Sequence, residues 1–278
     1  MDDKRLRELK KEDVYNVELN NHEKRVISKY KKEKELENGN IRIMDWGCAR
    51  GDKVAYLRSK GYKAHGVDIN KKYVESGKKY FEREYKNKNI IKEISKDNKS
   101  GFEEGLFDIV LSTNVFEHVE NLEGVVEESS RISKRGSFHF HFFPAKYHLV
   151  ESHLDMPLVH WLPKREIRKK VIKAYLRLGV KPKEGWEDMR KSGLEETAQV
   201  LYDYTVNSVY YRSNKEVRSI FESCGMSAKT ISAGSPKLKK IMGPLYYFTK
   251  IKPFYVLLGR LISTFRSTAL FAKNKKRK

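Results

Sequence analysis

The chain has 278 residues, 39% hydrophobic and 12% aromatic, which suffices for one large domain or for one domain with an insertion. Its 58 basic and 37 acidic residues give a net charge of +21, which either attracts anions such as nucleic acid, lipid headgroups and phosphorylated molecules or reflects solvated basic faces. No run of eighteen uncharged apolar residues occurs, so we expect no membrane-spanning helix, and the charged N-terminus does not resemble a signal peptide. The spacing of Cys48 and Cys224 predicts free thiols in a reducing, cytoplasmic compartment.

The first half of the chain alternates between predicted helices and strands. Residues 1–37 have apolar residues at helical spacing and predict one or two helices. Strands are then expected at 41–45, 63–67, 90–94, 107–112 and 138–143, and helices at 52–60, 71–86 and 122–132. This alternation is typical of a parallel sheet in an α/β domain.

The alternation breaks after Pro144 and resumes at Ser213. The residues between them predict a His- and Pro-rich loop, a basic helix around 167–176, an acidic helix near 187–201 and a tyrosine-rich piece. A capping box at Ser213–Glu216 then opens a helix, and strands are expected at 228–232 and 267–273. We therefore expect three regions: 1–144, N-terminal helices and cofactor-binding core; 145–212, an insertion; and 213–278, the remaining core with a helical crossover and a basic tail.

The stretch from Ile41 to Asn70 carries the clearest chemical signal. Gly47 and Gly51 follow a predicted strand, where the missing Cβ lets the backbone approach a ligand and the next helix directs its N–H groups at that ligand. Asp68 ends the second strand, 23 residues after Asp45, at the distance from which an acid reaches ribose hydroxyls in dinucleotide folds. The pattern predicts a nucleotide-type site.

Three motifs in order resemble those of class I S-adenosylmethionine-dependent methyltransferases. IMDWGCARG is similar to their first motif, with Ala49 where a middle glycine usually stands, and GVDIN at 66–70 is similar to the second. FDIVLSTNVFEHV at 107–119 resembles the fourth-strand motif of the ubiquinone-biosynthesis-type subgroup. The resemblance covers about 41–144 and returns at 213–232 and 267–273. It implies a Rossmann-like, seven-stranded, mostly parallel sheet with an antiparallel last strand and a helical insertion between strands five and six.

The resemblance also implies S-adenosyl-L-methionine as the cofactor and assigns residues to it. The expected set is Asp45 near the amino group, Gly47, Cys48, Ala49 and Gly51 around the methionine part, Asp68 on the ribose, Ile69 against the adenine, and Asn114 and Val115 lining the pocket. The acid that often sits near the adenine in this family falls at Lys96 here, so Asp97 beside it is expected instead.

Two histidines are candidates for a general base, which is needed only if the acceptor is a hydroxyl or a protonated amine. His118 follows the fourth strand at the edge where such sites form, and the alternative for it is a structural, helix-capping role. His141, near the end of the fifth strand, is the rival.

The chain also gathers five of its eight histidines within residues 139–160. His139 and His141 share a strand face, and with Glu151 and Asp155 nearby they raise the question of a divalent metal. Because no HExxH-like helical spacing occurs, packed or hydrogen-bonded histidines are favoured and no metal is expected.

The resemblance implies a methyltransferase (EC 2.1.1.-) acting on a small or lipid- or glycan-linked acceptor, with oxygen as the favoured atom and residues 145–212 covering the acceptor. One alternative is an RNA methyltransferase using the +21 charge, which the lack of an N/D-P-P-Y/F-type motif after strand four disfavours. Another is a non-catalytic scaffold with a cofactor-binding fold at a membrane.

Residues 241–266 mix aromatic and basic side chains. They predict a crossover between the last two strands, a segment that docks on anionic lipid at the inner membrane face, or both.

Overall fold

A computed structural model describes residues 7–95, 97–144, 146–182, 186, 193–231 and 267–275. Its centre is a seven-stranded sheet in the order β3-β2-β1-β4-β5-β9-β8. The strands are β1 (Arg42–Trp46), β2 (Lys63–Asp68), β3 (Ile91–Glu93), β4 (Phe107–Thr113), β5 (Ser133–Pro144), β8 (Met226–Ile231) and β9 (Ser267–Asn274). Strand β9 runs antiparallel to both of its neighbours, and the strand pairs from β3 to β5 are parallel. The predicted Rossmann-like sheet is therefore confirmed.

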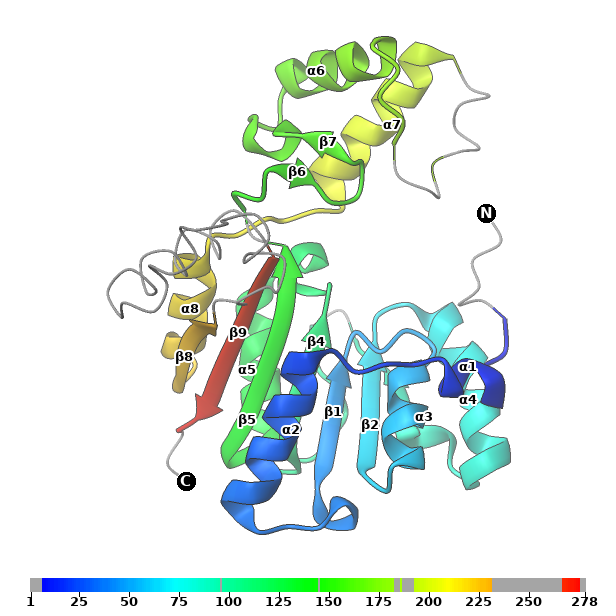
Figure 1. Ribbon diagram of the computed structural model, residues 1–278, viewed down its shortest axis with the longest axis vertical. Coiled ribbons are helices and arrows are strands. Elements are labelled where there is room, and N and C mark those ends of the chain that lie inside the picture. The colour runs from blue at the N-terminus through cyan, green and yellow to red at the C-terminus, as the bar shows by residue number, and fades with distance from the viewer. Residues whose placement is uncertain are drawn as a thin grey trace, which may run out of the picture.

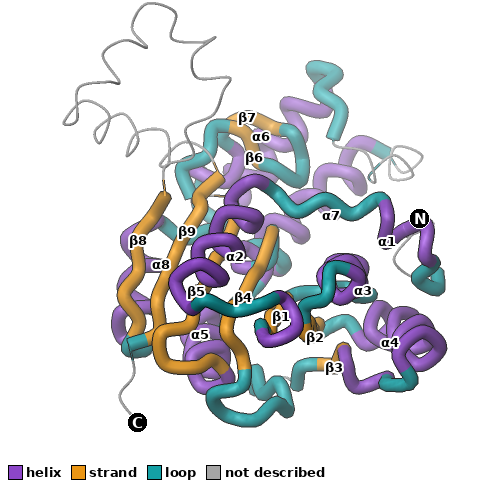
Figure 2. Tube along the Cα trace, turned by 60° about the horizontal axis from the view of Figure 1, so that its bottom comes forward, coloured by secondary structure: helices purple, strands orange, loops and turns teal. Residues whose placement is uncertain are grey.

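Helices cover both faces of the sheet (Figures 1 and 2). Helices α2 (Asn21–Lys34), α3 (Asp52–Ser59) and α4 (Lys71–Tyr85) contribute buried apolar residues to one core cluster. Helices α5 (Leu122–Ile132) and α8 (Asn214–Ser223) contribute to a second cluster. The short helix α1 (Lys11–Tyr15) contacts α3. Strand β4 is buried along nearly its whole length, as expected of a strand covered on both faces.

The insertion between β5 and α8 forms its own small unit. It contains a hairpin of β6 (Val150–Glu151) and β7 (Met156–Pro157), followed by α6 (Glu166–Arg177) and α7 (Leu194–Asn207). A separate apolar cluster, which includes Met156, Ile172 and Leu201, holds these elements together. The unit lies beyond the carboxyl ends of the parallel strands (Figure 1).

Two segments predicted from the sequence lie partly or wholly outside the described residues. The acidic helix expected near 187–201 corresponds to α7, which begins at Leu194 and continues to Asn207, and residues 187–192 lie outside the described part of the chain. Residues 241–266, predicted as a crossover or a lipid-docking segment, also lie outside it. Among the helices that the structure describes, none has the length and apolar character to cross a membrane.

Strand β5 buries two histidines, and the pH dependence of stability should reflect them. His139 is 0% exposed and His141 1% exposed, and burial lowers the pKa of His139 to about 3 and that of His141 well below its usual value. These folded pKa values lie below those of the unfolded chain, so protonation at low pH favours unfolding.

We expect these two histidines to lower the unfolding free energy as the pH drops below about 6.5. Replacing His139 with Gln should reduce this slope by about 1.4 kcal/mol per pH unit between roughly pH 5.5 and 4, because one fewer proton is taken up on unfolding. Urea unfolding of both proteins at several pH values measures the slopes. Parallel curves for wild type and His139→Gln would contradict the assignment.

Candidate functional site

The loop between β1 and α3 depends on two glycines with left-handed backbone. Gly47 has φ +75° and Gly51 has φ +88°. A Cβ on Gly47 would lie 2.3 Å from Cγ2 of Val115, and one on Gly51 would lie 2.7 Å from the Phe81 ring. Both glycines are thus required by the packing of the loop against the protein itself, in addition to any approach of a ligand. The contact also places Val115, two residues beyond the end of β4, against the loop.

The carboxylate of Asp68 lies at this loop. Its Oδ2 accepts a hydrogen bond of 2.7 Å from the Ala49 backbone N–H, and its Oδ1 accepts one of 2.8 Å from the N–H of Asn70. The N–H groups of Gly47 and Cys48 both donate to the carbonyl of Val67, at 2.8 and 2.9 Å. The end of β2 and the glycine loop therefore form one hydrogen-bonded unit, and the replacement of glycine by Ala49 leaves that unit intact.

The side chains of Cys48 and Ile69 differ in exposure. Cys48 is buried, with its Cβ packed where a side chain on Gly66 would collide, and burial raises the pKa of its thiol. Ile69 is 70% exposed although it is apolar, and it stands directly after Asp68. An apolar side chain is therefore exposed next to the carboxylate that ends β2.

Asp45 is paired within the protein. Lys53 Nζ, on α3, lies 3.2 Å from Asp45 Oδ1 and 2.9 Å from Glu23 Oε1, and it also donates to Thr113 at 3.3 Å. Burial raises the pKa of Asp45 to about 6, against the opposing effect of Lys53. Burial alone would lower the pKa of Lys53, but the charges of Asp45 and Glu23 outweigh burial and hold that pKa above its ordinary value.

Asn114 and Asp97 occupy turns at the same edge of the sheet. Asn114 has φ +55°, and its N–H donates to the carbonyl of Phe142 at 2.7 Å. Asp97 is exposed and accepts hydrogen bonds from the Ser95 hydroxyl and from the N–H of Lys99. Its loop adjoins Asp68, whose carbonyl accepts from the N–H of Ile94 at 3.0 Å. Lys96 lies outside the described residues.

The two histidines predicted as bases lie in different surroundings. His141 is enclosed in the core, with its Nδ1 2.7 Å from the Ser112 hydroxyl and its ring stacked on Phe116 at 4.4 Å between centroids. His118 is exposed on the short helix η4 (Phe116–His118), and its Nδ1 lies 2.9 Å from the carbonyl of Ser208. Of the two, only His118 has access to an acceptor at the edge of the sheet.

The insertion brings a third histidine to this edge. Ligand atoms of Glu117, His118 and His153 lie within 4.8 Å of one another. Glu117 is 3% exposed, its Oε2 has no hydrogen-bond partner among the described residues, and burial raises its pKa to about 7. We call these three residues the Glu117 cluster.

A buried carboxylate fixes the orientation of His153. The Nδ1 atom of His153 lies 2.9 Å from Glu151 Oε1 and 3.1 Å from the hydroxyl of Tyr211. That hydroxyl also donates a hydrogen bond to Glu151. Glu151 is 0% exposed, and although burial raises its pKa, the hydrogen bonds from His153 and Tyr211 outweigh burial and lower it. The sequence had grouped Glu151 with His139 and His141. This grouping is wrong, because both of those histidines point into the core from β5.

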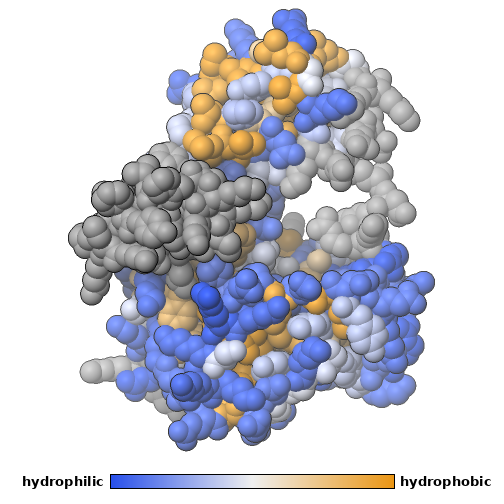
Figure 3. Space-filling model, in the orientation of Figure 1, coloured by the Kyte–Doolittle hydropathy of each residue, from blue (hydrophilic) through white to orange (hydrophobic). Residues whose placement is uncertain are grey.

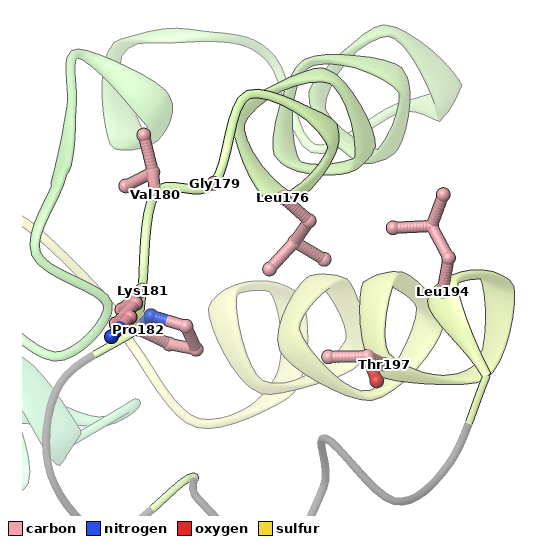
Figure 4. Close-up of a pocket in the computed structure, with 7 residues that line it drawn as sticks. All are labelled: Leu176, Gly179, Val180, Lys181, Pro182, Leu194 and Thr197. Carbon is pink, nitrogen blue, oxygen red and sulfur yellow. The ribbon is translucent and has the colours of Figure 1, made fainter.

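A separate pocket lies within the insertion. Figure 4 shows it between the end of α6 and the start of α7, with Leu176 facing Thr197. Its lining is mostly apolar and comes from Leu176, Gly179, Val180, Lys181, Pro182, Leu194 and Thr197. None of these residues belongs to the glycine loop or to the Glu117 cluster, so we do not assign this pocket to the site.

In Figure 3 the molecule is hollowed between the insertion and the carboxyl edge of the sheet.

A comparison with protein families decides the class. A model described as a methyltransferase domain matches residues 44–140, from within β1 to within β5. These residues form a class I methyltransferase domain. The cofactor of this class is S-adenosylmethionine, as the sequence motifs implied.

Individual relatives agree with this. The chain is 30% identical over 105 residues to the ubiquinone biosynthesis O-methyltransferase of Pelagibacter ubique (strain HTCC1062). The match covers 36% of this chain and 41% of that relative, so it spans less than half of the relative.

Solved methyltransferases share the fold. One is phosphoethanolamine N-methyltransferase 2 of Haemonchus contortus, in complex with phosphomonomethylethanolamine and S-adenosylhomocysteine (14% identity, TM-score 0.50, 92% of this chain and 53% of that one). Another is a putative sarcosine dimethylglycine methyltransferase of Galdieria sulphuraria (16% identity, TM-score 0.50, 97% and 92%). At these identities they show the fold of the methyltransferase domain alone.

The sequence did not predict which residues contact Asp45 and Glu117, because those residues lie far from them in the chain. Glu23 and Lys53 are ordinary charged residues of amphipathic helices by their spacing, and only the fold brings both to Asp45. His153 was noticed as one of many histidines, but nothing in its neighbourhood predicts contact with Glu117. One local signal did exist, because Glu117 directly precedes His118 in a motif that follows a strand of the methyltransferase domain.

Proposed function

We propose that this chain transfers a methyl group from S-adenosylmethionine to an oxygen atom of a small or lipid- or glycan-linked acceptor held beneath the insertion. The observation that carries the proposal is the hydrogen bond of 2.7 Å between the Ala49 N–H and Asp68, which joins the glycine loop to the carboxylate at the end of β2. That unit has the parts that an adenosyl sulfonium ligand needs: a bend for the methionine part and an acid for the ribose.

The cofactor would lie along the carboxyl edge of the sheet. Asp68 would accept hydrogen bonds from the ribose hydroxyls, and the exposed side chain of Ile69 would pack against the adenine. Gly47 and Val115, which contact each other, would border the methionine part. Asp97 is already engaged by Ser95 and Lys99 in its own turn, so we assign it a weaker part in binding the adenine.

The acceptor would enter from the side of the insertion. An acceptor oxygen attacks the methyl carbon, the carbon–sulfur bond breaks, its electron pair stays on sulfur, and the hydroxyl proton leaves to a base. Holding the two reactants in line can contribute about 7–11 kcal/mol. Two members of the Glu117 cluster, Glu117 and His118, follow Val115 by two and three residues. The cluster would therefore lie near the acceptor and receive its proton.

Oxygen is favoured as the target for two reasons. The relative with 30% identity is described as an O-methyltransferase. The Glu117 cluster also supplies a carboxylate and two imidazoles, which are groups that accept a proton from a hydroxyl.

Product analysis tests the proposal. Purified protein should convert methyl-labelled S-adenosylmethionine to S-adenosylhomocysteine in the presence of a panel of phenolic, glycan and lipid-linked hydroxyl acceptors, and the label should appear in ether linkages. Transfer to RNA or to nitrogen at matched concentrations would overturn the choice of acceptor. Cofactor binding with no transfer to any acceptor would instead support a non-catalytic scaffold, for which vesicle sedimentation of the full chain is the companion measurement.

A further inference from the structure

We propose that Glu117, His118 and His153 bind a divalent cation of the zinc, manganese, iron or cobalt type at the mouth of the acceptor site. The ligand atoms of the three side chains lie within 4.8 Å of one another, although they come from η4 and from the turn after β6. Two imidazoles and one carboxylate favour these ions over Mg²⁺ and Ca²⁺, which prefer oxygen ligands.

The two histidines are oriented as metal ligands usually are. In metal sites the nitrogen that does not bind the ion donates its N–H to a carboxylate or a carbonyl, which fixes the tautomer and the ring. Here His118 Nδ1 lies 2.9 Å from the Ser208 carbonyl, and His153 Nδ1 lies 2.9 Å from the buried carboxylate of Glu151. Both bonds leave Nε2 as the nitrogen available to an ion.

Glu117 supplies an independent observation. The side chain is 3% exposed, and its Oε2 is buried without a hydrogen-bond partner in the part of the chain that the structure describes. A buried carboxylate oxygen left without a partner is costly, and a cation would remove that cost.

The geometry requires only a small closure. Two ligands about 2.1 Å from a tetrahedral ion lie roughly 3.4 Å apart, so the side chains would move together by about an ångström on binding. The three protein ligands leave a coordination position for an acceptor hydroxyl, whose pKa the ion would lower. With the ion bound, the hydroxyl proton would leave to water, because the ligand atoms of the Glu117 cluster are occupied. This last role rests on the proposed function, whereas the cation site itself does not.

Metal titration tests the site directly. Full-length protein treated with a chelator should bind one equivalent of Zn²⁺ or Mn²⁺ by calorimetry, and Co²⁺ should give the visible bands of a site with nitrogen and oxygen ligands. Glu117→Gln and His153→Ala should each weaken binding at least 100-fold. The matched control is His148→Ala, because His148 lies in the same insertion but bonds to the carbonyl of Val150 and stands outside the cluster. It should bind as wild type does.

A second measurement uses only wild-type protein, in case a variant fails to fold. Zn²⁺ should protect His118 and His153 from diethyl pyrocarbonate, mapped by mass spectrometry, while His148 stays reactive. Absence of stoichiometric binding, equal binding by the Glu117 and His153 variants, or absence of protection would overturn the site. Methyl transfer that persists unchanged in a chelator, with binding intact, would overturn only the role of the ion. Metal binding without any methyl transfer would contradict the proposed function and leave the site standing.

Discussion

Replacing Lys53 with Met should lower the unfolding free energy of the protein at pH 7.5 by about 3 kcal/mol, because it leaves Asp45 and Glu23 buried as like charges without a cation. Asp45 is 4% exposed and Glu23 2% exposed, and Lys53 Nζ is within 3.2 Å of both. Urea unfolding at neutral pH measures the loss.

The effect should also depend on pH with a definite sign. The folded-state pKa of Asp45 is already raised to about 6, and loss of Lys53 raises it further. A carboxyl group whose folded pKa is raised destabilises the fold as the pH increases through the range between its unfolded and folded pKa values. The cost of Lys53→Met should therefore be smaller at pH 5 than at pH 7.5.

Two comparisons separate this explanation from a general effect of losing a lysine. Lys78→Met removes a lysine whose ion pair with Glu75 lies at the surface, and it should cost less than about 1 kcal/mol. Adding Glu23→Gln and Asp45→Asn to Lys53→Met should recover much of the lost stability. If Lys53→Met lowered the unfolding free energy equally at pH 5 and at pH 7.5, the explanation by buried charges on Asp45 and Glu23 would be wrong.

Replacing Asp68 with Ala should weaken the binding of S-adenosylhomocysteine about 100-fold. Hydrogen bonds to a charged group contribute roughly 1.5–3 kcal/mol each, and 1.4 kcal/mol is a factor of ten in affinity. The substitution removes the acid proposed to hold the ribose, and it also removes the bonds from Asp68 to the N–H groups of Ala49 and Asn70. Calorimetry with both proteins measures the difference.

The matched control is Asp203→Ala on α7, where the carboxylate bonds only to Gln199 among the contacts that the structure gives. This variant should bind S-adenosylhomocysteine as wild type does. Circular dichroism and thermal unfolding show whether the Asp68 variant remains folded. Unchanged affinity in a folded Asp68→Ala protein would mean that the ribose lies elsewhere.

The sequence predicted those features of the fold whose role depends on residues close together in the chain. Strand β4 reads FDIVLST and is buried on both faces, so its apolar run alone identified it. The glycines at 47 and 51 have the left-handed φ that the turn requires, and Asp68 lies against their loop. Each of these features lies within a span of about thirty residues.

The features that could not be predicted depend on contacts between distant segments. Glu151 and His153 look like members of a histidine-rich loop, and only the docking of the insertion brings His153 to Glu117. His141 was predicted as a candidate base because it lies near the end of a strand at the correct edge. The alternation of β5 instead turns its ring into the core against Phe116, and a one-residue change of register would have reversed that.

A crystal structure of the full-length protein with S-adenosylhomocysteine would show whether Asp68 and the glycine loop hold the cofactor. We expect one bound molecule with its ribose hydroxyls within hydrogen-bond distance of Asp68, its adenine against Ile69 and its sulfur beside the Gly47–Gly51 loop. A ribose bound away from Asp68 would contradict the proposed cofactor site, and so would a bound S-adenosylhomocysteine that does not contact the Gly47–Gly51 loop.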